Sequence, residues 1–81
     1  MWYVYILRSK KDGDFYIGCT KNLKRRIREH NKGYTASTKN RIPFELIHKE
    51  VYDVRVNAYT REREIKDMKG GVAFKELLNK H

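Results

Sequence analysis

Apolar and polar residues alternate at the start of the chain, and this pattern predicts two β-strands. The first is expected over Trp2–Arg8 and the second over Phe15–Cys19, where aromatic and β-branched residues favour an extended backbone. Successive side chains of a strand point to opposite faces, so the apolar residues of the first strand should divide between two sides. One side is expected to carry Tyr3, Tyr5 and Leu7, and the other Trp2, Val4 and Ile6.

A short turn at Asp12-Gly13 is predicted to join these strands into an antiparallel hairpin. With a two-residue turn, the numbers of paired residues sum to an odd value, and a loop two or four residues longer keeps that parity. Residues that pair directly share one face of the sheet. Tyr5, Tyr16 and Gly18 are therefore predicted to lie on the same face, while slippage of the register leaves their exact partners open.

Helical spacing then predicts a short helix from about Asn22 to Asn31. Thr20 or Asn22 can cap its start, because a short polar side chain accepts a hydrogen bond from a free N–H of the first turn. Gly33 suits the left-handed position that follows a helix end. The helix carries two stripes, an apolar one of Leu23 and Ile27 that can face a core and a polar one of Arg26 and His30.

The second half of the chain predicts one strand and two helices after a polar loop over residues 34–41. Alternation over 44–52 is expected to place Phe44, Leu46, His48, Glu50 and Tyr52 on one face of the third strand. The helices are expected from Asp53 or Val54 to Met68 and from Val72 to Asn79. Their apolar residues are Ala58, Ile65 and Met68 in the first, and Val72, Phe74, Leu77 and Leu78 in the second, which should be buried. The order β-β-α-β-α-α predicts a single α+β domain over residues 1–81.

The composition adds a strong positive charge, because 19 Lys and Arg against 10 Asp and Glu leave a formal net charge of +9. A small domain this basic usually binds a polyanion, so a nucleic acid is the expected partner. The alternatives are a surface charged for solubility and a ribosome-associated protein that only binds. The residues expected to bind the nucleic acid lie on and just before the first helix: Lys21, Lys24, Arg25 and Arg28. The single cysteine excludes an intramolecular disulfide, and no stretch approaches the ~20 apolar residues of a membrane span. We therefore expect a cytoplasmic protein with no membrane partner.

Several of these residues follow one another in a way that resembles GIY-YIG nuclease domains. Tyr3-Val4-Tyr5 is followed about ten residues later by Tyr16-Ile17-Gly18, and Arg26 and His30 follow on the next helix. Glu62, in the run Arg-Glu-Arg-Glu-Ile-Lys of a later helix, matches the metal-binding glutamate of that family. The chain is most similar to the small stand-alone members of bacteria, which resemble the N-terminal domain of the excision-repair nuclease. The resemblance covers nearly the whole chain.

The resemblance implies a three-stranded antiparallel sheet flanked by helices. It also implies a metal-dependent endonuclease, with Mg²⁺ or Mn²⁺ as cofactor, that hydrolyses DNA phosphodiester bonds in DNA repair or processing. By position, Tyr5 and Tyr16 match the catalytic tyrosines and Arg26 matches the phosphate-binding arginine. His30 falls where the family has a histidine or tyrosine, and Glu62 matches the metal ligand.

Three positions depart from the family's pattern. Tyr3 replaces the first glycine, Cys19 stands where some members have a lysine, and Asn79 is the one candidate for an asparagine near the C-terminus. The last two departures motivate a second hypothesis, a DNA- or RNA-binding module with a degenerate site. For the nuclease, specificity is expected to be weak or to come from a partner protein, because these residues include no separate DNA-reading domain.

Hydrolysis of a phosphodiester needs a base for the nucleophile and positive charge beside the phosphoryl oxygens. Either Tyr5 or Tyr16 can be that base, with a slight preference for Tyr5 that the sequence does not decide. A phenol with an ordinary pKa of ~10 is a poor base at neutral pH, so Arg26 and a metal are expected to lower the pKa. The planar fork of Arg26 suits a phosphate, and His30 can accept a proton from a tyrosine or donate to a phosphate.

The same residues also have purely structural explanations. The two tyrosines could be aromatic packing, the arginine a solvated side chain and the histidine a residue at a helix end. Glu62 could form a surface ion pair with Lys66, one turn along the helix, and Glu64 is the alternative metal ligand, although it points to another face. The other residues of metal-binding type, His48, His81 and Cys19, lack the spacing of a metal site.

Overall fold

The computed structural model describes residues 1–79, which form one three-stranded sheet and three α-helices. In chain order the elements are β1 (Trp2–Ser9), β2 (Phe15–Thr20), α1 (Leu23–Asn31), the 3₁₀ turn η1 (Lys39–Arg41), β3 (Phe44–Tyr52), α2 (Arg55–Met68) and α3 (Val72–Leu78). The predicted order and the α+β class are confirmed, and η1 is a short addition inside the predicted polar loop. None of the helices in residues 1–79 is long and apolar enough to cross a membrane. His81 lies outside the described residues.

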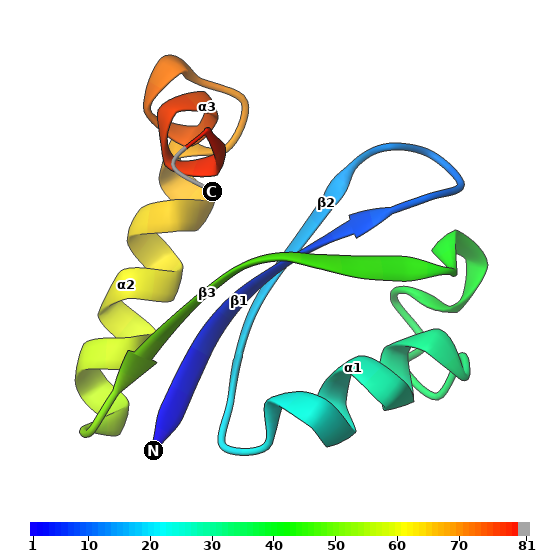
Figure 1. Cartoon of the computed structure of the whole chain (residues 1–81), viewed down its shortest axis with the longest axis horizontal. Helices are drawn as coiled ribbons and strands as arrows, with labels where there is room; N and C mark the ends of the chain where they lie inside the picture. Colours follow the sequence, from blue (N-terminus) through cyan, green and yellow to red (C-terminus); the bar gives the residue numbers. More distant parts are fainter. Residues whose placement is uncertain (80–81) are drawn as a thin grey trace.

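The sheet has the strand order β2-β1-β3, so β1 lies in the centre and pairs antiparallel with both neighbours (Figure 1). Tyr5 pairs with Gly18 and Leu7 pairs with Tyr16, so paired numbers sum to an odd value as the turn signal predicted. The loop is two residues longer than the minimal turn, because the Ser9 N–H donates to the Asp14 carbonyl oxygen at 2.9 Å. The predicted placement of both tyrosines and the glycine on one face is therefore confirmed.

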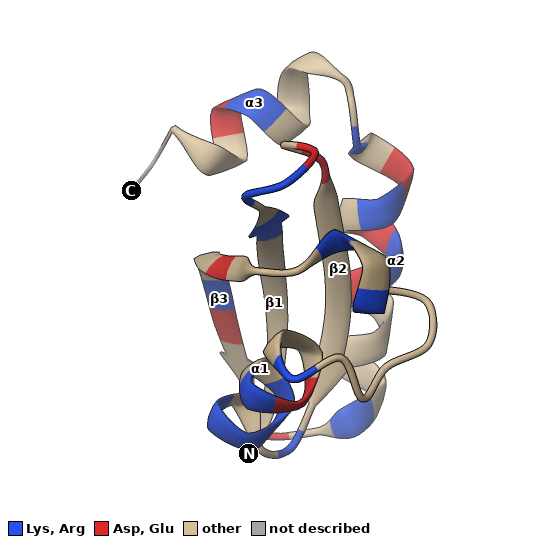
Figure 2. Cartoon of the chain, turned by 90° about the vertical axis from the view of Figure 1, so that its right-hand side faces the viewer, with Lys and Arg blue, Asp and Glu red and all other residues tan. Residues whose placement is uncertain are grey.

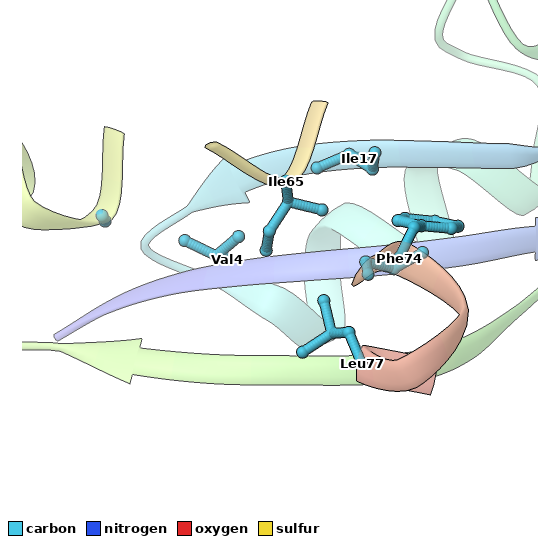
Figure 3. Packing of buried hydrophobic residues seen from close by; sticks show 7 residues of the cluster. Val4, Ile17, Ile65, Phe74 and Leu77 are labelled. Carbon is cyan, nitrogen blue, oxygen red and sulfur yellow. The ribbon is translucent and has the colours of Figure 1, made fainter. Parts of the chain in front are cut away.

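Helices α2 and α3 cover the face of the sheet that carries Val4 and Ile6 (Figure 1). Figure 3 shows the packing of this core, in which Ile65 of α2 and two residues of α3 lie against the strands. The cluster consists of Val4, Ile6, Ile17, Ala58, Ile65, Phe74 and Leu77. The predicted burial of Val72 is wrong, because this first residue of α3 is 72% exposed while the helix turns Phe74 and Leu77 inward.

Helix α1 covers the opposite face and packs Leu23 and Ile27 against a cluster that includes Leu7 and Phe44. Both ends of α1 lie close to the residues that the sequence predicted as caps. Of the two predicted caps, Asn22 is the one used, since its side chain accepts from the Arg25 N–H at 3.0 Å. Gly33 has a φ of +77° after the last turn, where its N–H donates to a helix carbonyl at 3.1 Å. These two caps fix the length of α1 and therefore the positions of its polar side chains.

The register of β3 against β1 shifts by one residue at Ile47. Such a β-bulge places two residues opposite one, and the alternation of side chains changes sides there. Phe44 and Leu46 consequently share the face of α1, whereas the strand beyond the bulge turns His48 and Tyr52 toward α2. The predicted placement of all alternate residues from 44 to 52 on one face is wrong for this reason.

A polar cluster joins the end of β3 to α2. Both carboxylate oxygens of Glu50 accept hydrogen bonds from the Arg61 guanidinium, at 2.8 and 3.2 Å. The Tyr52 hydroxyl donates to the same carboxylate at 2.6 Å, and His48 Nε2 lies 2.7 Å away. Burial by itself would raise the pKa of Glu50, but the hydrogen bonds from Arg61, Tyr52 and His48 outweigh it and lower the pKa to about 2.

We predict that Glu50 makes the fold sensitive to acid. Its folded-state pKa is lowered, so its contribution to stability is present above the ordinary pKa of 4.5 and is lost as the pH falls toward 2. The contribution is on the order of 3 kcal/mol. Urea unfolding at pH 7, 4 and 2.5 should show a smaller acid-dependent loss of unfolding free energy in Glu50→Gln than in the wild type. Glu45→Gln, at an exposed position of the same strand, is the control, and an unchanged acid response of Glu50→Gln would contradict the prediction.

Candidate active site

Four of the five predicted catalytic residues meet on the face of the sheet that α1 covers. Tyr5 and Tyr16 come from neighbouring strands, and their ring centroids are 6.3 Å apart. Arg26 and His30 come from α1, one turn apart. The His30 ring lies 4.7 Å from the Tyr16 ring and 6.1 Å from the Tyr5 ring, measured between centroids. The arrangement arises because the hairpin parity and the helix phase direct these side chains to one place.

Gly18 allows Tyr5 to take its position. The Tyr5 hydroxyl and the ring carbon that carries it occupy the space that a Cβ at residue 18 would need. Any other residue at this position would push the ring away, because real Cβ atoms do not approach other atoms so closely. The Tyr5 side chain therefore crosses β2 above its glycine and is only 1% exposed.

A buried chain of hydrogen bonds starts at the Tyr5 hydroxyl. It lies 3.2 Å from Nε2 of His30, and Nδ1 of the same ring lies 2.9 Å from Oγ1 of Thr38. His30 and Thr38 are completely inaccessible to solvent. Burial, aided by the charge of Arg26, lowers the pKa of His30 to about 4, so the ring is neutral at pH 7. The sequence did not single out Thr38, a small polar residue within a loop that lacks periodicity.

The Tyr5 hydroxyl is more difficult to ionise than the sequence suggested. Burial raises the pKa of Tyr5 to about 12, and the hydrogen bond from Arg26 opposes this increase without cancelling it. Arg26 lowers the pKa of Tyr5 as expected, but the desolvation that comes with nearly complete burial is the larger effect and raises the pKa overall.

Arg26 is held beside the tyrosine but keeps an open side. Its guanidinium lies against the Tyr5 hydroxyl, and its Nη1 is 3.3 Å from Oε1 of Glu29. The side chain remains 35% exposed. Glu29 was missed in the sequence, although its spacing of three residues from Arg26 on one helix was the available signal. The two contacts aim a cation at the solvent-facing part of the site.

Glu62 lies on α2, across the sheet from the other four residues. Its carboxylate is 14% exposed and forms a 2.7 Å ion pair with Lys66, the contact weighed above as a structural alternative. Burial is the main reason why the pKa values of Tyr5 and Cys19 are raised, and the charge of Glu62 adds to both increases. Glu64 pairs with Arg61 at 3.7 Å and is far more exposed.

The oxygen atoms of Glu62 fit a hard divalent cation. Residues 1–79 contain no group of three or more His, Cys, Asp and Glu side chains that could hold a metal. Mg²⁺ commonly binds one or two carboxylates and keeps several waters, with substrate phosphate completing its shell, so one carboxylate is a sufficient protein ligand. Glu62 also borders an open hollow of about 560 Å³ along α2, together with Tyr59 and Arg63. An ion and its waters have access there.

The remaining predicted residues lie outside this group. Cys19 is on the α2 face of β2, and burial raises the pKa of its thiol, so it is a weak nucleophile. Asn79 is the exposed C-cap residue of α3. The basic residues proposed to bind DNA lie on α1 and just before it and are exposed: Lys21, Lys24, Arg25 and Arg28. Figure 2 shows blue Lys and Arg segments along α1.

Comparisons with known proteins find a family model, relatives and a solved structure that are similar to this chain. The sequence model of the GIY-YIG catalytic domain matches residues 1–74. A UPF0213 protein of Haloquadratum walsbyi is 46% identical over 65 residues, which cover 79% of this chain and 72% of that protein. A UPF0213 protein of Staphylococcus saprophyticus is 43% identical over 65 residues, covering 79% and 78%. The solution NMR structure of a UPF0213 protein from Bacillus halodurans is similar with a TM-score of 0.50 and 33% identity, and covers 91% of this chain and 92% of that one.

Proposed function

Because the chain belongs to the family of GIY-YIG catalytic domains, we propose that it is a metal-dependent endonuclease that hydrolyses DNA phosphodiester bonds. The observation that carries the proposal is the convergence of two tyrosines, a neutral histidine and a partly exposed arginine at one place. The DNA substrate, the metal and a role in DNA repair or processing all belong to this proposal.

Arg26 is proposed to bind the phosphate that reacts. Its guanidinium has donors in a planar fork that match two oxygens of a phosphate, and its exposed side leaves these donors accessible. Tyr5 and Glu29 hold the other side, so little reorganisation is needed when the substrate binds. A donor fixed in advance stabilises the charge that develops on the phosphoryl oxygens during attack.

Tyr16 is proposed as the general base. Its half-buried ring borders the site next to His30, whereas the Tyr5 hydroxyl is buried and already engaged by His30 and Arg26. The pKa of about 12 also makes ionisation of Tyr5 unfavourable. Tyr5 then has the role of holding Arg26 in place. The burial of Tyr5 thus favours Tyr16 for the choice that the sequence left open.

Glu62 is proposed to hold a divalent cation, Mg²⁺ or Mn²⁺. When bound, the ion would supply positive charge beside the phosphoryl and leaving oxygens. The chain's own contribution is a carboxylate whose partner Lys66 is largely exposed and can move away. Arg26 itself, and Glu62 through the ion that it would hold, would each supply positive charge to the bound substrate.

A cleavage assay tests this function. Purified protein is incubated with supercoiled plasmid and with single-stranded DNA, in Mg²⁺, in Mn²⁺ or in excess chelator. We expect nicking or cleavage that requires the metal and disappears with the chelator. Tyr16→Phe, which keeps the ring and removes the hydroxyl, should lose this activity. Absence of metal-dependent cleavage on every substrate would contradict the proposal.

The second candidate function is a DNA- or RNA-binding module without turnover. The observation that favours it is Cys19, whose thiol carries no positive charge at the position where some family members have a lysine. This function predicts binding that weakens steeply with salt, because basic residues on α1 release counterions from the nucleic acid. It also predicts no product in the assay above, so one experiment separates the two candidates.

A further inference from the structure

The hydrogen bonds around His30 continue into the loop that precedes β3. Thr38 lies just before η1, and its Oγ1 is 2.9 Å from Nδ1 of His30 and 3.4 Å from the carbonyl oxygen of Thr35. It is completely buried. Nε2 of His30 faces the Tyr5 hydroxyl at 3.2 Å. Both ring nitrogens therefore have a partner, and which nitrogen carries the proton decides the direction of every bond.

Arg26, at one end of this series of hydrogen bonds, determines the direction of the first bond. Arg26 lies close enough to the Tyr5 hydroxyl to affect its pKa, and a guanidinium can only donate, so the Tyr5 oxygen rather than its proton should face Arg26. The hydroxyl proton of Tyr5 is then free to point to Nε2 of His30, which must be unprotonated to accept it. Because a neutral imidazole carries one N–H, the proton belongs on Nδ1.

Thr38, at the other end of this series of hydrogen bonds, independently indicates that His30 is protonated at Nδ1. The Thr38 hydroxyl has a carbonyl acceptor in Thr35, so its proton has a partner on that side. Its oxygen can then accept the Nδ1–H of His30. The donors run in one sequence from Arg26 to Tyr5, His30, Thr38 and the Thr35 carbonyl.

We propose that Thr38 is a positioning residue that fixes the tautomer of His30 and thereby turns the Tyr5 oxygen toward Arg26. In the other tautomer, Nε2–H would donate to the Tyr5 oxygen and compete there with Arg26, and the buried hydroxyl proton of Tyr5 would lose its acceptor on His30. Arg26 would then be held less firmly on its Tyr5 side. The part of this inference that concerns cleavage rests on the proposed nuclease function, whereas the part that concerns the tautomer does not.

The tautomer can be measured directly. ¹⁵N NMR of the histidine side chains identifies the protonated ring nitrogen of His30, and we expect Nδ1–H in the wild type. Thr38→Val has nearly the same shape but no acceptor, so Nδ1–H would be buried without a partner, and His30 should change to Nε2–H. Thr38→Ser keeps the hydroxyl and should keep Nδ1–H. Tyr5→Phe should also keep Nδ1–H, because Thr38 rather than Tyr5 sets the tautomer.

The single-turnover cleavage rate provides the second measurement. Thr38→Val should lower the rate at saturating DNA by about 10- to 100-fold, the range known for metal-ligating histidines that lose their hydrogen-bond partner. Thr38→Ser should restore it to within about two-fold of the wild type. A wild type with Nε2–H, a Thr38→Val protein that retains Nδ1–H, or a Tyr5→Phe protein that changes tautomer would each overturn the proposal. If Thr38→Val does not fold, the tautomer of His30 in the wild type and in Tyr5→Phe still tests the proposal. A wild type without nuclease activity would refute only the proposed function.

Discussion

Replacing Glu62 with glutamine should abolish the metal stimulation of cleavage and lower the rate at saturating metal by about 10³-fold. The substitution keeps the shape of the side chain and removes the negative charge that a divalent cation needs. A metal at the phosphoryl oxygens contributes several kcal/mol to transition-state stabilisation, and about 4 kcal/mol corresponds to this loss. Lys66 loses its ion-pair partner in the variant, but it is more than half exposed and can be solvated.

Glu64→Gln is the matched control for this prediction. Glu64 lies two residues away on the same helix, is 57% exposed and pairs with Arg61. It should bind metal and cleave as the wild type does. Mn²⁺ binding, followed by electron paramagnetic resonance, reports on the site without relying on activity. A Glu62→Gln protein that binds Mn²⁺ and retains metal-stimulated cleavage would remove Glu62 from the site.

Replacing Arg26 with alanine should lower the plateau rate of single-turnover cleavage by about 10²-fold or more. The guanidinium is proposed to touch the reacting phosphate, where the charge increases between the bound state and the transition state. An interaction that strengthens in the transition state affects the plateau rate and not only the affinity. The rate should therefore stay low even at saturating DNA.

Arg28→Ala supplies the comparison on the same helix. Arg28 is exposed and its contacts are proposed to involve flanking phosphates, which hold substrate and transition state equally. Its loss should raise the DNA concentration for half-maximal rate, reduce the salt slope of binding by about one or less, and leave the plateau rate nearly unchanged. Lys24→Ala should behave in the same way. If Arg26→Ala resembles these two variants, Arg26 is a binding residue and its catalytic assignment is wrong.

The hairpin and the first helix could be predicted because local rules determine them. The parity of paired residues follows from the turn, so the shared face of Tyr5, Tyr16 and Gly18 did not depend on the exact register. The caps of α1 follow from Asn22 and Gly33, whose side chain and backbone freedom act within one helical turn. Such features depend only on residues that are close together in the sequence.

Other parts of the site depend on contacts between distant residues, and the sequence could not supply them. The pKa of Tyr5 depends on a balance between burial and Arg26, and the extent of burial is known only once β1 is placed beneath α1. Thr38 lies in a polar loop where nothing distinguishes it from its neighbours until His30 is placed beside it. Glu62 approaches from the other side of the sheet, so its assignment relied on the family resemblance.

The bulge at Ile47 has a consequence for how β3 tolerates insertions and deletions. The extra residue reverses which side chains face α1 and which face α2. One strand can therefore bury Phe44 beneath α1 at its beginning and direct Glu50 toward α2 at its end. Removing one residue would restore regular alternation along the whole strand. The side chains of one half of the strand would then point to the wrong face of the sheet. Phe44 would then leave the His30 ring, which it contacts edge-on. Length at this point of the chain is therefore constrained more tightly than residue identity.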